Sequence, residues 1–362
     1  SSVHSGQVFL CGCLCGTLNR HMTCSAFSDA ITAPAHLKVA TDDIDDHVSE
    51  LLTEDVREAF YSQGINDEFM VAQASLEAST FGAIQSTERT PLSPTIRGVV
   101  ATLMHKMVVS LNLEVDRLYE MIALFDLYCL RCERDASELC KSLPVLVGAI
   151  LRLVAKHDHQ SACVDASFLG LGESFKNVLA GSYGVTADPI TLAATNKMEM
   201  TVLETTGWNV ILPTVHWWSV SFMARFTAMV EQRDLPRLSW IWQQHTQVKI
   251  AQLTQIIKPS DLAPRHLAIG VFALGLARAN MLPINVLFPD EDCHARKHFL
   301  EHQPQACQIS TESNEDECST LTRKMEVATG APVVSICEHC KAIMTFSSAF
   351  ARIRLGVSSA GG

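Results

Sequence analysis

DPITLAATNKMEMTVLETTGWNVILPT, residues 188–214, contains one complete helix signal with a start, an apolar face and a stop. Asp188 followed by Pro189 predicts the start, with a carboxylate cap and proline at the first helical position. The residues at the spacing of one helix face are Leu192, Thr195, Met198, Val202 and Leu203. Gly207 predicts the end, because glycine adopts the left-handed C-cap conformation at low cost. A connector then leads to a further helix that opens at Pro213.

Glu199 is the unexpected residue of this helix, because it lies on the apolar face between Thr195 and Val202. A carboxylate in such a position is paired with a cation, reaches past its neighbours to solvent, or is kept for a partner molecule. The spacing alone leaves these three interpretations open.

The residues before this stretch predict four further helices. Residues 94–110 and 114–131 each carry apolar side chains on one face. Residues 142–156 are apolar nearly all round, which is typical of a helix buried on every side. Pro144 is placed in the first turn of that helix, where proline is tolerated. A fourth segment, 165–181, is interrupted by glycines. Five helices around one buried rod predict an all-α domain.

The composition is that of a globular protein with room for two domain cores: 362 residues, 48% hydrophobic and 19% charged. A formal net charge of −11 without Lys/Arg clusters argues against nucleic acid or an anionic membrane surface as the partner. No apolar run reaches the roughly 18 residues that a membrane-spanning helix needs. No cationic segment followed by an apolar run marks a secretory signal.

Thirteen cysteines are present at irregular spacings. An odd number without a regular framework favours free thiols in a reducing compartment. Two pairs, Cys129/Cys132 and Cys337/Cys340, have the spacing CxxC, but a zinc site needs four ligands. We expect no bound metal.

The predicted helices also carry four charged residues in local contexts that are similar to those of the cyclin box. Arg97 in Ile-Arg-Gly-Val-Val takes the place of the arginine in a motif like M-R-A-I-L on the first helix. Asp126 in Phe-Asp-Leu-Tyr-Cys, 29 residues further along, matches an aspartate near the end of the second helix. Lys156 ends the third helix in Val-Ala-Lys, and Glu199 lies in the fifth helix. Because all four occur in this order, the chain resembles the cyclin family.

The resemblance covers about residues 91–288, with its specific motifs confined to 96–214. It implies two consecutive five-helix cyclin-like bundles with disordered tails. The second bundle is expected from looser helical patterns at 213–230, 235–257 and 262–280. The expected division is a disordered tail (1–46), an N-terminal helix and linker (47–90), a first cyclin box that binds a kinase (91–212), a second cyclin-like fold (213–302), an acidic Ser/Thr/Glu-rich linker (303–332), and a C-terminal helix and tail (333–362).

The four charged residues have separate expected roles. A charge at the margin of an apolar helix needs a partner, so Arg97 and Asp126 are expected to form a buried structural pair. The resemblance implies that Lys156 and Glu199 lie close together and hydrogen-bond the regulatory helix of a cyclin-dependent kinase. From Lys156 alone, a lysine favoured by the helix dipole is the better explanation.

The first helix also carries a candidate docking patch. Many cyclins bind short Arg-x-Leu peptides at this place, and its apolar residues are present here as Ile96, Val99, Val100 and Leu103. However, Lys106 replaces the glutamate that would pair with the arginine of the peptide. Docking of that type is therefore not expected to be retained unchanged.

The sequence contains no Gly-rich phosphate loop, nucleophile elbow or metal-binding helix motif. We expect neither catalytic activity nor a cofactor in this chain. The resemblance implies a regulatory subunit that binds and activates a cyclin-dependent protein kinase by repositioning its regulatory helix, in cell-cycle or transcription control. The alternative is a cyclin-fold scaffold that binds transcription or other peptide partners without activating a kinase.

Overall fold

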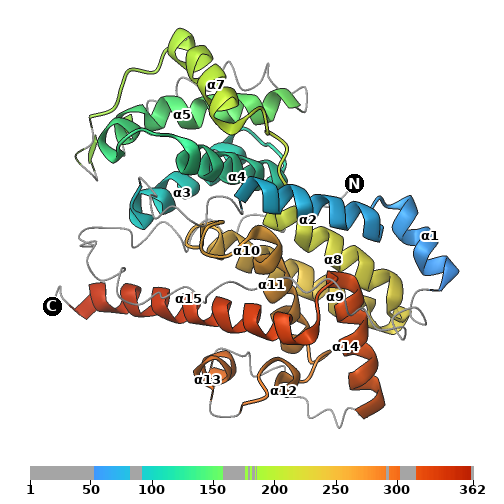
Figure 1. Ribbon diagram of the computed structural model, residues 1–362. Helices are drawn as coiled ribbons and strands as arrows, with labels where there is room; N and C mark the ends of the chain where they lie inside the picture. The colour runs from blue at the N-terminus through green and yellow to red at the C-terminus, as the bar shows by residue number, and fades with distance from the viewer. Residues whose placement is uncertain are drawn as a thin grey trace, which may run out of the picture.

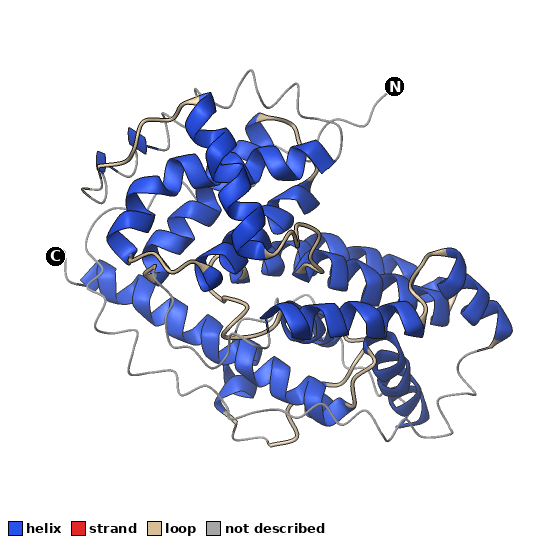
Figure 2. Ribbon diagram, turned by 45° about the horizontal axis from the view of Figure 1, so that its top comes forward, coloured by secondary structure: helices blue, strands red, loops and turns tan. Residues whose placement is uncertain are grey.

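The computed structural model describes residues 53–81, 92–157, 176–177, 180–181, 184, 186–290, 293–301 and 315–359. Within these ranges the chain forms helices and loops without a strand, which confirms the predicted all-α class (Figures 1 and 2). The predicted N-terminal tail 1–46 and most of the interrupted helix 165–181 lie outside the described residues.

The first half contains α3 (Pro94–Ser110), α4 (Val115–Arg131), α5 (Ala136–His157) and α7 (Leu192–Thr206). The bounds of α3 and α4 agree with the prediction to within one residue. The apolar residues of α5 are fully or almost fully buried from Leu139 to Ala155, apart from the half-buried Cys140 and Leu153, which confirms the predicted buried rod. It packs against α7 on one side and α4 on another (Figure 1).

The start of α5 corrects one expectation. The helix begins at Ala136 instead of residue 142, so Pro144 lies inside the helix and not in its first turn. The earlier start has a local cause, because Asp135 Oδ1 accepts a hydrogen bond from the Glu138 backbone N–H at 2.8 Å and caps the helix. Burial of the following turns compensates for the backbone hydrogen bond that the proline removes.

The start of α7 is a second correction. Thr191, and not Asp188, is the N-cap, and its hydroxyl accepts a hydrogen bond from the Ala194 N–H at 3.1 Å. Asp188 and Pro189 therefore lie in the loop before the helix. The predicted end is confirmed, because Gly207 is the C-cap with a left-handed φ of 67°.

The second half contains α8 (Val215–Met229), the 3₁₀ turn η4 (Gln232–Asp234), α9 (Leu235–Trp240), the π-helix η5 (Ile241–Thr246), α10 (Gln247–Leu253), α11 (Pro264–Arg278), α12 (Ile284–Leu287) and α13 (His294–Glu301). The single helix predicted over 235–257 is thus divided by a π-turn. This wider turn places His245 against α11, where its Nε2 lies 3.2 Å from the Val271 carbonyl oxygen.

The structure contains two helices that the sequence pattern did not predict, and both contact the second half. The first is α2 (Asp67–Phe81), which falls in the predicted linker after the expected helix α1 (Glu54–Ser62). α14 (Glu315–Thr329) falls in the acidic linker predicted over 303–332, and it packs against α8 with Met325 and Ala328 buried. The composition of that segment favoured a linker, whereas its apolar residues have helical spacing. α15 (Val333–Ser359) confirms the predicted C-terminal helix.

The buried apolar side chains form two main clusters. One cluster joins α3, α4, α5 and α7, and the other joins α8, α10, α11, α14 and α15. α11 lies at the centre of the second cluster, packed on α8 and α15, and its residues from Leu267 to Ala277 are all buried (Figure 1). The burial of α11 in the second half parallels that of α5 in the first.

Gly270 allows α11 and α15 to approach closely, and Gly270→Ala is expected to lower the free energy of unfolding by about 1 to 3 kcal/mol. A Cβ atom at this position would lie 2.4 Å from Ile343 Cδ1 and 3.1 Å from the His339 carbonyl carbon. Gly98→Ala is the matched control, because the nearest atom there is 3.5 Å away. Urea unfolding should show a lower free energy of unfolding for Gly270→Ala and no decrease for Gly98→Ala. Equal effects would contradict the close helix contact.

Candidate partner-binding site

Glu199 lies between two cations at the contact of α5 and α7. Its Oε2 accepts a hydrogen bond from Lys156 Nζ at 2.5 Å, and its Oε1 lies 3.0 Å from Arg152 Nη1. Arg152 also donates to Asn196 Oδ1 at 2.7 Å. Arg152 and Lys156 are four residues apart, so α5 presents both on one side. The structure brings Lys156 and Glu199 together, and this spacing from Lys156 is the signal by which Arg152 could have been found.

Lys156 and Glu199 differ in exposure. The Lys156 side chain is 44% exposed, whereas the Glu199 side chain is 9% exposed. Within the described structure Glu199 Oε1 forms an ion pair with Arg152 but accepts no hydrogen bond, and this oxygen atom is buried. A buried carboxylate oxygen that lacks a hydrogen bond gains free energy when a donor reaches it. The pair therefore offers a partner an accessible ammonium group, which is held in place by a largely buried carboxylate.

Apolar side chains continue from this pair along the outer side of α7. Met200 and Trp208 are exposed, and Leu203, one turn beyond Glu199, is half-buried. We call Met200, Leu203 and Trp208 the α7 strip. Large apolar side chains exposed beside a charged pair are typical of protein-binding surfaces, where tryptophan often contributes most of the affinity.

The backbone presents Trp208 in an unusual conformation. Trp208 has a left-handed φ of 62°, directly after Gly207, and its N–H donates to the Leu203 carbonyl at 2.7 Å. Arg131 at the end of α4 donates from Nη1 to the Thr206 carbonyl at 2.8 Å. A bulky residue in this region of φ is strained, and the hydrogen bonds around it hold it there. The result is a fixed turn that leaves Trp208 62% exposed.

Arg97 and Asp126 form the buried ion pair that we expected, with Nε–Oδ1 and Nη2–Oδ2 distances of 2.7 and 2.6 Å. Burial acts to lower the pKa of the Arg97 guanidinium, but the charge and hydrogen bonds of Asp126 outweigh it and the pKa is raised. Arg97 Nη1 also donates to the Thr254 carbonyl at 2.8 Å. The pair thus joins α3, α4 and the end of α10, and it connects the two halves of the chain.

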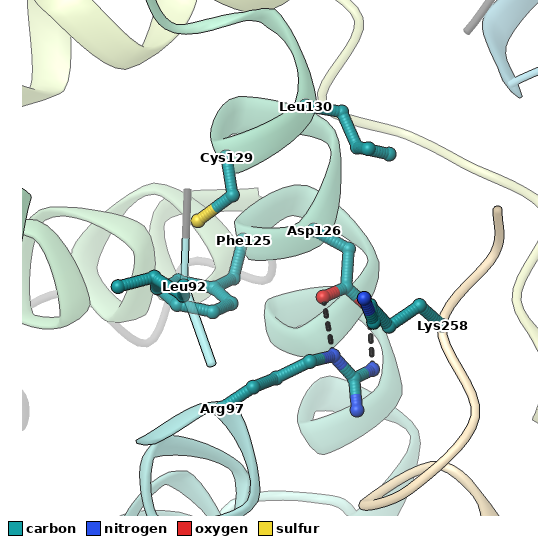
Figure 3. A pocket seen from close by; sticks show the side chains of 7 residues that line it. All are labelled: Leu92, Arg97, Phe125, Asp126, Cys129, Leu130 and Lys258. Atoms are coloured by element: carbon teal, nitrogen blue, oxygen red, sulfur yellow. Dashed lines mark hydrogen bonds and ion pairs between the residues drawn. The ribbon is translucent and has the colours of Figure 1, made fainter. Parts of the chain in front are cut away.

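Figure 3 shows this ion pair in a small pocket. Arg97 and Asp126 face each other, and the other lining residues are Leu92, Phe125, Cys129, Leu130 and Lys258. Both side chains of the pair are about 95% buried. The pair is therefore placed to hold helices together and is not presented to a partner.

The candidate docking patch on α3 is corrected in part. Val100 is fully buried in the first core cluster and cannot contact a peptide. Ile96, Val99 and Leu103 are half-buried, and Lys106 is exposed. Helical spacing explains the difference, because Val100 lies on the inner side of α3 together with Met104 and Met107.

The described residues contain no group of three or more His, Cys, Asp or Glu side chains that could hold a metal ion. The cysteines of both CxxC pairs are free thiols, and burial raises the pKa of the Cys129 and Cys340 thiols well above its usual value. Among the described helices, none combines the length and apolar character needed to cross a bilayer.

Comparisons with protein-family models, with curated proteins and with solved structures find no match for this chain.

Proposed function

We propose that the protein is a regulatory subunit that binds and activates a cyclin-dependent protein kinase by repositioning the kinase's regulatory helix. The observation that carries the proposal is the pair of Lys156 and Glu199, fixed by Arg152 and flanked by the α7 strip. The order and local context of Arg97, Asp126, Lys156 and Glu199, which resemble those of the cyclin box, support it.

The chemistry of the site suits a helix and its flanking loop as the bound element. The Lys156 ammonium group is a donor for carbonyl oxygens, and the Glu199 carboxylate is an acceptor for N–H groups. Both are needed where a helix end leaves backbone groups without partners. The α7 strip adds apolar area for the side of that helix. An interface of this kind is expected to be large and apolar at its centre.

Binding would activate the kinase by displacement. Pressure of the α7 strip on the regulatory helix moves that helix inward, so that the kinase's own Lys–Glu ion pair forms and its activation loop opens. This chain contributes position and contact area, and the kinase performs the chemistry. The proposal implies a heterodimer in the nucleus, the cytoplasm or both, acting in cell-cycle or transcription control.

The proposal also includes two consecutive cyclin-like folds. In this interpretation α3, α4, α5 and α7 belong to a first five-helix box, and the helices from α8 to α13 belong to a second, diverged one. Two core clusters, each with one helix buried along its length, support that division.

The experiment is a capture assay with a panel of purified cyclin-dependent kinases. The wild-type chain is expected to retain at least one kinase. Lys156→Ala/Glu199→Ala is expected to weaken that binding by about 2 to 5 kcal/mol, because truncation removes hydrogen-bonded charges from the interface. The matched control is Lys197→Ala/Glu204→Ala, which removes two exposed charges of α7 that are not part of the site and should bind as the wild type does.

Two outcomes would reject the proposal in different ways. If no kinase is retained by a folded wild-type chain, the scaffold function replaces it. If a kinase is retained equally by all three chains, this chain binds kinases at another surface.

A further inference from the structure

The helix α2 lies across both halves of the chain. Figure 1 shows it between α4 and α8. At its C-terminal end Phe81 packs with Leu127 of α4 and Leu212 of the connector, and the Thr80 carbonyl accepts from Arg131 Nη2 at 3.4 Å. Closer to its start, Met70 belongs to the core cluster of the second half. A segment with these contacts acts as a strap that holds the two halves in one arrangement.

Glu77 is the charged group by which this strap is attached to the second half. The residue is only 5% exposed. Its Oε2 accepts a hydrogen bond from the indole Nε1 of Trp218 in α8 at 2.6 Å, and another from the Arg265 backbone N–H at 3.1 Å. Arg265 is the second residue of α11, so the carboxylate lies at the positive end of that helix.

No cation within the described structure forms an ion pair with this carboxylate. The guanidinium of Arg265 donates instead to the carbonyls of Thr329 and Gly330 and lies over the ring of Trp218. The guanidinium of Arg225 in α8 donates to Asp67 and to the carbonyls of Ile65 and Val327. Arg131 of α4 is bound to backbone carbonyls. The Glu77 carboxylate therefore has neutral N–H donors but no paired positive charge.

A buried carboxylate in these surroundings titrates near neutral pH. Desolvation raises the pKa of Glu77 from 4.5 to about 7, although the hydrogen bonds of Trp218 and Arg265 and the charge of Arg265 act to lower it. When α2 detaches, the carboxyl group returns to water and to its ordinary pKa.

We propose that α2 is a proton-sensitive strap, which binds the second half tightly when Glu77 is protonated and loosens when Glu77 ionises. The direction follows from linkage. The attached strap binds a proton more strongly than the detached one, so attachment is strongest below pH 4.5 and weakens as the pH rises through 7. The useful window is pH 6 to 8, because it brackets the pKa of Glu77 while the buried His266 and His339 of the folded protein stay neutral, with pKa values lowered to about 4 and about 3.

The test is amide hydrogen exchange of the full chain between pH 6 and 8, divided at each pH by the intrinsic exchange rate. The opening constant of α2 (67–81) is expected to rise about tenfold in the wild type. The peptide of α5 (136–157) serves as the internal control, and its opening constant should not change with pH in this way. Glu77→Gln keeps an acceptor for the indole and removes the titration, so its α2 opening should be independent of pH.

Two further variants keep the test decisive. Glu68→Gln changes an exposed carboxylate of the same helix, so the α2 opening constant of this variant should rise with pH as that of the wild type does. Trp218→Phe removes one hydrogen-bond donor to the ionised Glu77 carboxylate, so the α2 opening constant of this variant should rise more than tenfold between pH 6 and 8. A constant α2 opening in the wild type, or a parallel rise in Glu77→Gln, would overturn the proposal. These readouts need no kinase.

Discussion

Replacing Asp126 with alanine is expected to lower the free energy of unfolding by about 3 to 5 kcal/mol. The change leaves the Arg97 guanidinium buried without its counter-ion, and among the described residues the Thr254 carbonyl is the acceptor that remains bound to it. A buried charge that loses its partner costs far more than the pair contributes, because the desolvation of the remaining charge is no longer offset. Urea unfolding followed by circular dichroism measures the difference.

Two comparisons separate this effect from an ordinary loss of a salt bridge. Glu120→Ala removes a half-buried carboxylate of α4 that pairs with Arg117, and it should cost about 1 kcal/mol or less. Arg97→Met/Asp126→Leu replaces both charges by apolar side chains and should recover most of the stability that Asp126→Ala loses. If Asp126→Ala lowers the free energy of unfolding no more than Glu120→Ala does, the Arg97–Asp126 pair does not connect the helices as described.

Acidification is expected to destabilise the protein through a buried pair of histidines. The rings of His266 in α11 and His339 in α15 are stacked with centroids 4.3 Å apart. Burial lowers the pKa of His339 from 6.5 to about 3, with smaller effects of His266 and Arg265, and burial likewise lowers that of His266 to about 4. Both histidines are therefore neutral in the folded protein at pH 7.

The sign of the pH dependence follows from these pKa values. Between pH 6.5 and 4 the unfolded chain takes up a proton at each histidine and the folded chain does not, so stability falls as the pH falls. For His339 alone the loss between pH 7 and 4 is about 3 kcal/mol. His339→Phe keeps a flat ring and removes the titration, so its stability should fall less over this range. If the wild type and His339→Phe lose the same stability between pH 7 and 4, His339 is not responsible for the loss. Glu77 changes the stability in the opposite direction, because its pKa is raised in the folded protein.

The long helices could be predicted from the sequence because their signals are local. The bounds of α3 and α4 follow from apolar spacing and flanking residues, and the burial of α5 and α11 follows from their apolar composition. The predicted start of α7 was wrong because Asp188 and Thr191, three positions apart, are both suitable caps. Which one is used depends on how the preceding loop packs, which no local pattern contains.

The prediction for α14 was wrong because it followed the polar composition of the segment and not the spacing of its apolar residues. The segment before Thr322 is rich in polar residues and was assigned to a linker, yet Leu321, Met325 and Ala328 have the spacing of one helix face in α14. α2 was missed for a related reason. Its inward side includes Glu77, which an apolar pattern excludes, and the burial of that carboxylate depends on Trp218, 141 residues further along.

The candidate site could be predicted only in part. Lys156 and Glu199 were paired by the cyclin resemblance, and the structure places them in contact. Arg152 was overlooked because it interrupts an apolar run, although its distance of four residues from Lys156 indicates a shared face. The exposure of Trp208 follows from its left-handed conformation, and Val100 was assigned to the surface because the inner and outer sides of α3 are both apolar.

The most direct test of the proposed function is the rate of phosphotransfer by the captured kinase, measured with and without a saturating amount of this chain. A large increase in rate is expected with the wild-type chain, and little increase is expected with Lys156→Ala/Glu199→Ala at the same concentration. A kinase that binds the wild-type chain but phosphorylates its substrate no faster would contradict the claim that this chain is an activating subunit.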